Sequence, residues 1–289
     1  MNPTYRLTLH AAVKNSLPAA EFALQRSRRT TLAQAIALAL SSSTAFAAPA
    51  LTELPSGGQI TSGRAGIAVD GSHMDVNQTS QNASLNWQTF NVGRNAEVEF
   101  HQPNASSVAV NRIADPDGSQ IMGRVDANGQ VYLINPNGVL FGKDAQVNVG
   151  GLVASTLDIA DADAASGKRT FSSSPLPAEE GPGVRANGDE ASVINQGTIT
   201  TSDGGYAALL GGRVSNQGTI AARLGTVALA AGDQVTLDFA GDKLLGVQVD
   251  KGALQALAEN KQLIQAEGGT VLLTARAADS LIQAVVNNT

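Results

Sequence analysis

Acidic side chains that lie close together can bind calcium or cleave polysaccharides, and the densest acidic cluster in this chain is Asp115-Pro116-Asp117-Gly118. Calcium sites need several carboxylates, and glycosidases need a facing pair. As the start of an EF-hand loop the cluster fails, because Gln120 replaces the required glycine and Asp126 the bidentate glutamate. The remaining acidic residues are scattered singly, so we expect a solvated turn at 115–118 and no enzymatic activity.

Histidine and cysteine offer little further chemistry. The chain has three histidines and no cysteine, which excludes disulfides, thiolate metal sites and cysteine nucleophiles. Beyond residue 47 only His73 and His101 remain, too few for a histidine-rich metal site or, without further support, a Ser-His-Asp site. We expect both histidines on the surface and predict no cofactor and no metal.

The charge balance excludes a nucleic-acid partner. The chain of 289 residues has 19 basic and 25 acidic residues and a net charge of -6, whereas proteins that bind DNA or RNA usually carry a clustered basic face. Only 15% of the residues are charged and 4% are aromatic. This composition is typical of an ordered protein with a closely packed backbone.

The first 47 residues have a net charge of +4, from five basic residues and one acidic residue, and the pattern of a secretory signal peptide. A basic stretch ends at Arg29, an apolar run covers residues 32–40, and Ala45 and Ala47 precede a cleavage point at Ala48. The apolar run is about half of the roughly 20 residues that a membrane-spanning helix needs. We predict an extended signal peptide over 1–47 and a soluble, exported part over 48–289, which keeps 14 basic and 24 acidic residues.

From about residue 190 the sequence repeats itself every 21 residues. The segment Ile194-Asn195-Gln196-Gly197-Thr198-Ile199 returns as Ser215-Asn216-Gln217-Gly218-Thr219-Ile220, and the same offset places Gly204 on Gly225 and Gly211 on Gly232. Short runs with the period-two alternation of strands lie between turns rich in glycine and asparagine. Units of about 20 residues without a crossover helix are typical of a parallel β-helix, in which each unit is one coil. The excess of small side chains fits a narrow stacked interior.

Three details of this organisation are open to test. Asn195 and Asn216 either form a ladder of amide hydrogen bonds along the stack, or are present only because asparagine favours turns. Residues 161–190, rich in Pro, Gly, Ser and acidic residues, break the pattern and predict a surface loop or short hairpin. Residues 252–264 have apolar side chains at helical spacing and allow one short helix.

The first half of the exported part has strong strand patterns around the turn Asn135-Pro136-Asn137-Gly138. Asparagine at the first position, proline at the second and glycine at the fourth fit a type I turn. Val139 begins the strand that follows. Trp87 and Tyr132 have the largest apolar areas here, so we expect them in the core or cap rather than at a contact with a partner.

Several of these motifs resemble those of a known family. Asn111-Arg112-Ile113, residues 134–139 and residues 151–156 (Gly-Leu-Val-Ala-Ser-Thr) resemble the two-partner secretion domain of filamentous haemagglutinin-like adhesins. The start, Met1-Asn2-x-x-Tyr5-Arg6-Leu7, resembles the extended signal region of large exported Gram-negative proteins. The family's second motif, Asn-Pro-Asn-Leu, is absent, which favours the high-molecular-weight adhesin branch.

The resemblance implies a fold, partners and a site. The fold is an all-β, right-handed parallel β-helix with an N-terminal cap and extra-helical strands or hairpins. The partners are the inner-membrane Sec machinery and an outer-membrane β-barrel transporter with periplasmic polypeptide-transport-associated domains. The family's motif maps onto Asn135, Pro136, Asn137, Gly138 and Val139 as transporter-recognition residues. The product is a secreted or cell-surface exoprotein that reaches a host or neighbouring cell through a downstream region.

Two alternatives accompany this interpretation. Parallel β-helices also form polysaccharide lyases and hydrolases, and the same secretion domain precedes haemolysins and contact-dependent toxins. The segment 284–289 looks like the opening of another coil without a polar cap. We therefore expect the chain to be a fragment or truncated product of a longer exoprotein.

Overall fold

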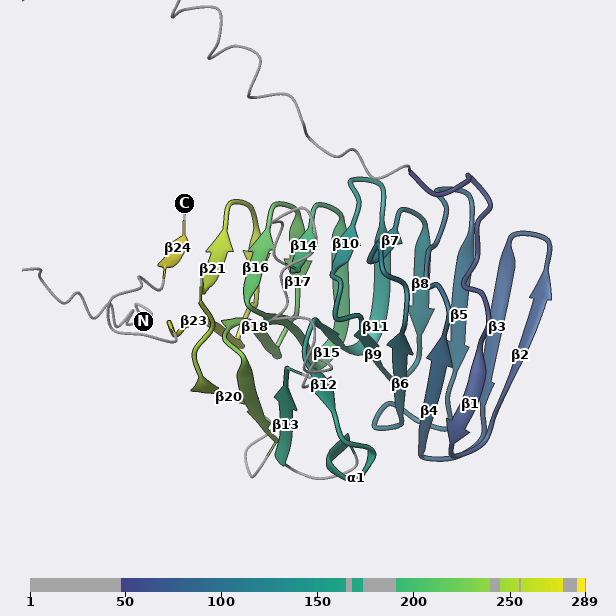
Figure 1. The fold of residues 1–289 in the computed structure, drawn as a ribbon, viewed down its shortest axis with the longest axis horizontal. Helices are drawn as coiled ribbons and strands as arrows, with labels where there is room; N and C mark the ends of the chain where they lie inside the picture. Colours follow the sequence, from purple (N-terminus) through teal and green to yellow (C-terminus); the bar gives the residue numbers. More distant parts are fainter. Residues whose placement is uncertain are drawn as a thin grey trace, which may run out of the picture. The chain divides into compact units, whose positions relative to one another are not determined.

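The computed structural model describes residues 48–164, 168–173, 191–239, 245–254, 256–277 and 285–288 (Figure 1). The predicted signal peptide over 1–47 and residues 174–190 of the predicted loop lie outside these residues. The described part consists of strands β1 to β24 and one short helix, α1 (Asp161–Ala164). Within that part, no helix has the length and apolar character needed to cross a membrane.

The strands stack on three faces, and the chain visits the faces in turn. The first face contains β3 (His73–Gln78), β5 (Glu97–His101), β8 (Arg124–Ala127), the first half of β11 (Gln146–Ser155), the first half of β15 (Thr198–Gly211), β17 (Thr219–Ala221) and β22 (Ile264–Gln265). The second face contains β4 (Asn82–Trp87), β6 (Val108–Ile113), β9 (Gln130–Ile134), the second halves of β11 and β15, β18 (Thr226–Ala231) and β23 (Thr270–Ala275). The third face contains β7 (Ser119–Ile121), β10 (Val139–Phe141), β14 (Ser192–Asn195), β16 (Arg213–Asn216), β21 (Leu257–Asn260) and β24 (Val285–Asn288). All pairings within these faces are parallel, so the prediction of an all-β parallel β-helix is confirmed.

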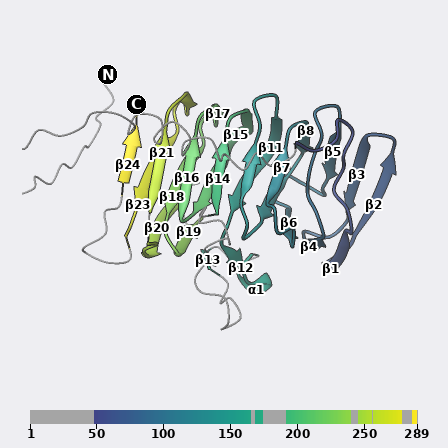
Figure 2. The same cartoon turned by 45° about the horizontal axis from the view of Figure 1, so that its top comes forward.

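A cap and an extra-helical sheet complete the architecture, as predicted. At the N-terminal end β1 (Gln59–Ser62) pairs antiparallel with β4, and β2 (Ala65–Asp70) pairs antiparallel with β3. Beside the second face, β12 (Asp158–Ile159), β13 (Lys168–Ser172), β19 (Gln234–Asp238) and β20 (Gly246–Lys251) form an antiparallel sheet. Figure 2 shows β12, β13 and α1 projecting from the stack.

Two hydrophobic clusters explain why the second face reads as a continuous apolar run. Val131 and Leu133 point into the stack, while Tyr132 and Ile134 point outward beneath the antiparallel sheet. A strand covered on both sides loses the alternation of a half-exposed strand. From β13, Arg169 reaches the Tyr132 hydroxyl, so this sheet is tied to the face that it covers.

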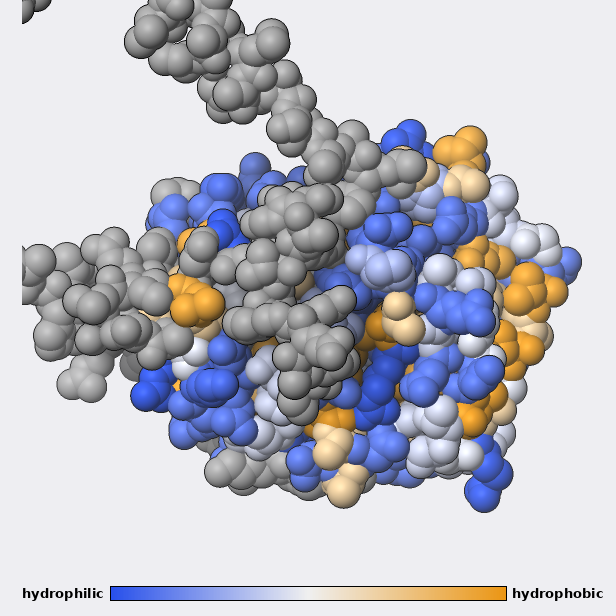
Figure 3. Space-filling view, viewed as in Figure 1, coloured by the Kyte–Doolittle hydropathy of each residue, from blue (hydrophilic) through white to orange (hydrophobic). Residues whose placement is uncertain are grey.

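The surface of the described residues is mostly polar, and apolar side chains gather at the cap end (Figure 3). Ile60 on β1 and Val69 on β2 are 39% and 58% exposed. Inside the stack, by contrast, small and medium apolar side chains are fully buried. The composition noted above therefore follows from the narrow interior.

Two sequence-based details need correction. The 21-residue offset holds for Asn195 on Asn216, but β15 pairs with β18 at an offset of 20, with Ala207 on Val227. The difference arises because the turn after Thr201 has one more residue than its counterpart in the next coil. The helix suggested for 252–264 is wrong, since Leu257–Asn260 is strand β21, paired with β16. In the segment 161–190, β13 pairs antiparallel with β12 and α1 lies between them, which agrees with the short hairpin that the sequence predicts as one alternative.

Candidate functional site at a surface turn

The motif Asn135-Pro136-Asn137-Gly138 forms the corner between β9 and β10. The Gly138 N–H donates to the Asn135 carbonyl at 2.9 Å, and the Asn137 N–H donates to Asn135 Oδ1 at 2.9 Å. Of the described non-glycine residues, Leu224 alone has a positive φ, so Asn137 cannot occupy a type II turn. Gly138 has a φ of 114°, which favours glycine. The type I turn predicted from the sequence agrees with this geometry.

The Asp115-Pro116-Asp117-Gly118 segment forms the same corner one coil earlier. Ser119 pairs with Val139, so the two four-residue turns stack at an offset of 20 residues. The Asp117 N–H donates to Asp115 Oδ1 at 3.0 Å, as in the turn above. Asp117 is exposed, but Asp115 is only 6% exposed, so the prediction of a solvated turn holds for one carboxylate and is wrong for the other.

A direct hydrogen bond joins the two turns. Asn137 Nδ2 donates to the Asp115 carbonyl at 3.0 Å. Asn135 is fully buried, and its Nδ2 donates to Ser119 Oγ at 3.1 Å. These contacts fix the height and tilt of the upper turn relative to the lower one.

The five motif residues therefore divide into two groups. Asn135, Gly138 and Val139 are buried and hold the turn in the stack. Pro136 is exposed and Asn137 is partly exposed. Only these two offer side-chain surface to a partner.

The Asn111-Arg112-Ile113 motif lies inside the structure. Trp87 Nε1 donates to Asn111 Oδ1 at 3.0 Å, and Ile113 is in the core. Trp87 is 2% exposed and Tyr132 fully buried, so the prediction that both pack inside is confirmed.

Arg112 links the β-helix to its antiparallel sheet. Arg112 Nε contacts Asp158 Oδ1 at 2.8 Å, and Nη1 contacts Asp161 Oδ1 at 2.8 Å. Burial lowers the pKa of Arg112, but hydrogen bonds to Asp158 and Asp161 outweigh it and raise that pKa. The guanidinium thus stays charged and fixes the start of the segment that leaves the stack.

We expect Arg112→Ala to lower the free energy of unfolding by about 1–2 kcal/mol, because charged hydrogen bonds of a partly buried group are lost. Urea denaturation followed by circular dichroism measures the change. Arg94→Ala is the control, since Arg94 forms an ion pair with Asp144 at 3.0 Å but its side chain is 65% exposed. Equal urea midpoints for Arg112→Ala and Arg94→Ala would contradict the proposed contribution of Arg112 to stability.

A ladder of asparagines runs along the third face; Asn195, Asn216 and Asn260 are buried, and Asn288 at its end is exposed. Asn195 Nδ2 donates to Asn216 Oδ1 at 2.8 Å, Asn216 to Asn260 at 2.7 Å, and Asn260 to Asn288 at 2.9 Å. The ladder interpretation of Asn195 and Asn216 is confirmed. Asn260 is not predictable from the repeat, because β19 and β20 interrupt the 21-residue spacing before it. Asn288 lies in the segment 284–289, which the sequence predicts as the opening of another coil, although not as part of the ladder.

The two histidines lie together on the first face, which sequence reasoning missed. His73 Nε2 lies 3.2 Å from Asp75 Oδ1, and His101 Nε2 lies 2.8 Å from the same oxygen. The hydrogen bond with Asp75 raises the pKa of His73, and the hydrogen bond with His101 lowers the pKa of Asp75. The expected surface position is correct, since His73 is partly exposed and His101 exposed.

The structure is thus a capped parallel β-helix with an antiparallel sheet beside it, and the β-helix is the fold of bacterial secretion domains. The comparisons agree: residues 52–289 match the TPS (two-partner secretion) secretion domain family. The chain belongs to this family, whose members are in general not enzymes.

Similar proteins come from Haemophilus influenzae. A heme/hemopexin-binding protein is 35% identical over 225 residues, which cover 78% of this chain and 24% of that protein. A second protein of that name is 46% identical over 86 residues, 30% of this chain and 9% of that protein. The solved HMW1 secretion domain has a TM-score of 0.65 and 33% identity, covering 75% of this chain and 55% of that one. The chain thus spans about a quarter of the length of the first of these relatives.

Proposed function

We propose that residues 48–289 are the secretion-targeting domain of a larger exported protein and that residues 1–47 direct it to the Sec machinery, with cleavage between Ala47 and Ala48. A cognate outer-membrane β-barrel transporter then binds the domain in the periplasm through its polypeptide-transport-associated domains. The family match over residues 52–289 supports this role. The domain acts by being bound, without catalysis.

The main support for the proposal is that the Asn135–Val139 motif has a buried part, which holds the turn in the stack, and an exposed part, which a partner can contact. A rigid turn that presents Pro136 and Asn137 to solvent on a buried base has little freedom to lose on binding. The Asn137 Nδ2 donates to the Asp115 carbonyl, and the Asn137 Oδ1 can accept a hydrogen bond from a partner. The turn therefore presents a proline ring and an amide oxygen in one fixed arrangement.

Secretion of Asn137→Asp, co-expressed with the cognate transporter, tests the recognition role. We expect about tenfold less secreted protein, equivalent to about 1.4 kcal/mol of lost binding. Aspartate cannot donate the hydrogen bond to Asp115, so Pro136→Ala is the second variant, because its exposed ring supports no hydrogen bond. Both variants should keep melting temperatures near that of the wild type.

Asp117→Asn is the matched control, because Asp117 has the equivalent position one coil earlier. Its secretion should equal that of the wild type. Wild-type secretion of both Asn137→Asp and Pro136→Ala would reduce the motif to a structural turn and remove the proposed site. Polysaccharide cleavage that is lost on substitution of Asp115 or Asp117 would instead favour the lyase or hydrolase alternative.

The activity of the whole exoprotein depends on the region downstream. Adhesins carry this class of domain, and two of the similar proteins are named for heme/hemopexin binding. We propose a cell-surface or secreted protein that contacts a host or neighbouring cell, an adhesin in the first instance. Sequencing the gene beyond codon 289 distinguishes an adhesin from a haemolysin, a toxin or a ligand-binding protein.

A further inference from the structure

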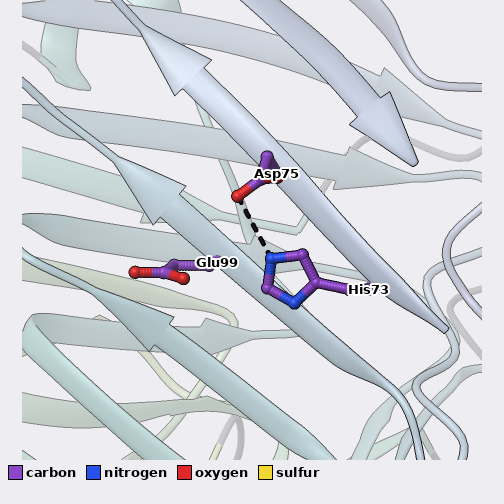
Figure 4. A group of neighbouring side chains, drawn as sticks. All are labelled: His73, Asp75 and Glu99. Carbon is purple, nitrogen blue, oxygen red and sulfur yellow. Dashed lines mark hydrogen bonds and ion pairs between the residues drawn. The ribbon is translucent and has the colours of Figure 1, made fainter. Parts of the chain in front are cut away.

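Three potential metal ligands meet on the outer side of the first face. Val98, Phe100 and Met74 point into the core, so the alternating residues His73, Asp75 and Glu99 point outward. β3 and β5 are parallel, with Asp75 opposite Glu99. One ligand atom from each of the three side chains lies within 4.8 Å of the others, and Figure 4 shows them on neighbouring strands.

The spacing of these atoms suits a small transition-metal ion. Two ligand atoms at about 2.0–2.1 Å from a tetrahedral zinc ion are about 3.3 Å apart. His73 Nε2 and Asp75 Oδ1 are 3.2 Å apart. An ion beside this pair needs only a small movement of the Glu99 carboxylate, whose side chain is 39% exposed.

Each of the three proposed ligands also contacts a further side chain, as metal ligands in proteins usually do. His73 Nδ1 lies 3.5 Å from Glu97 Oε2, so its proton can stay on Nδ1 and leave the Nε2 lone pair for an ion. Arg124 Nε holds the other oxygen of Glu97 at 3.2 Å. His101 Nε2 contacts Asp75 at 2.8 Å and lies 3.7 Å, through Nδ1, from Glu99. The Nε2–H of a neutral His101 thereby orients the Asp75 carboxylate.

The charges around this point favour a cation. Asp75, Glu97, Glu99 and Asp126 lie together with Arg124 as the cationic partner in the contacts described above. With neutral histidines, four carboxylates facing one guanidinium leave an excess of negative charge. A divalent ion offsets most of it.

We propose that His73, Asp75 and Glu99 bind one divalent transition-metal ion of the Zn²⁺ type, with His101 and Glu97 as positioning residues. The imidazole ligand favours such an ion over Mg²⁺ or Ca²⁺, which prefer all-oxygen sites. The ion cross-links β3 to β5, and so joins the first two coils next to the cap.

Titration of the purified protein, without a polyhistidine tag, with ZnCl₂ against a chromophoric chelator tests the site. We expect one equivalent of Zn²⁺ to bind in the presence of excess Mg²⁺ and to raise the melting temperature. His73→Gln, Asp75→Asn and Glu99→Gln should each weaken binding by at least about tenfold, and His101→Gln should weaken it less. Asp144→Asn is the control, because this carboxylate also pairs with an arginine but lies outside the cluster.

Melting curves in metal-free buffer show whether each variant folds. Glu99→Gln is the safest variant, since the contact of Glu99 with His101 is long and exposed. No stoichiometric Zn²⁺ binding by the wild type, or wild-type affinity in folded Glu99→Gln and His73→Gln, would overturn the proposal. Equal loss in Asp144→Asn would also overturn it, because binding would then be nonspecific.

Discussion

Gly225→Ala is expected to lower the free energy of unfolding by about 3 kcal/mol and the melting temperature by about 6–12 °C. Gly225 lies in a column of glycines at one corner of the stack, where successive backbones touch. A Cβ atom on Gly225 would lie 2.0 Å from the carbonyl oxygen of Gly205, and one on Gly269 would lie 2.0 Å from that of Gly225. Two coils must therefore separate to accept a methyl group.

Thermal melting followed by circular dichroism measures this effect. Gly66→Ala is the control, because a Cβ at Gly66 in β2 meets nothing within 4 Å and Gly66 has no positive φ. Its melting temperature should match that of the wild type within about 2 °C, as for most surface substitutions. If Gly225→Ala melted at the same temperature as Gly66→Ala, the close contact between the coils at Gly225 would not contribute to stability.

Asn216→Ala is expected to lower the free energy of unfolding by about 2–4 kcal/mol. Asn216 is fully buried, and it accepts a hydrogen bond from Asn195 and donates one to Asn260. Its truncation removes both bonds and takes a partner from two other buried amides, each a penalty of about 1–3 kcal/mol. Chemical denaturation gives the change.

Asn148→Ala is the control for that variant. Asn148 Nδ2 also donates to a side chain, Asp126 Oδ1 at 2.9 Å, but Asn148 is exposed. Water replaces the lost bond there, so a change under about 0.5 kcal/mol is expected. Similar losses in both variants would show that the ladder adds nothing beyond an ordinary surface hydrogen bond.

The parts of this fold that depend on local sequence were predictable. The corner at Asn135 follows from the φ of proline and the freedom of glycine, and it forms the same way wherever the flanking strands lie. The Asn195 and Asn216 pair was visible because nothing interrupts the chain between them. Burial of Trp87 and Tyr132 followed from their size.

The parts that depend on register were not predictable. Asn260 pairs with Asn216 across 44 residues, because β19 and β20 intervene. β13 pairs with β19 across 66 residues, and the polar sequence around β13 gives no strand signal. His73, Asp75 and Glu99 meet only when β3 and β5 pair in one particular register, since a slip of one residue would turn Glu99 into the core.

The coils of the β-helix stack in the order of the sequence, and this order has a mechanical consequence. Each coil is held chiefly by the coils before and after it, so tension applied at the last coil acts on one interface at a time. At about 3.4 Å per extended residue, the release of a 21-residue coil lengthens the chain by roughly 70 Å. The coil between Asn216 and Asn260 spans 44 residues and gives roughly twice that extension. On the third face, successive coils are offset by 20, 54, 21, 44 and 28 residues, so a force–extension trace should show steps of several sizes.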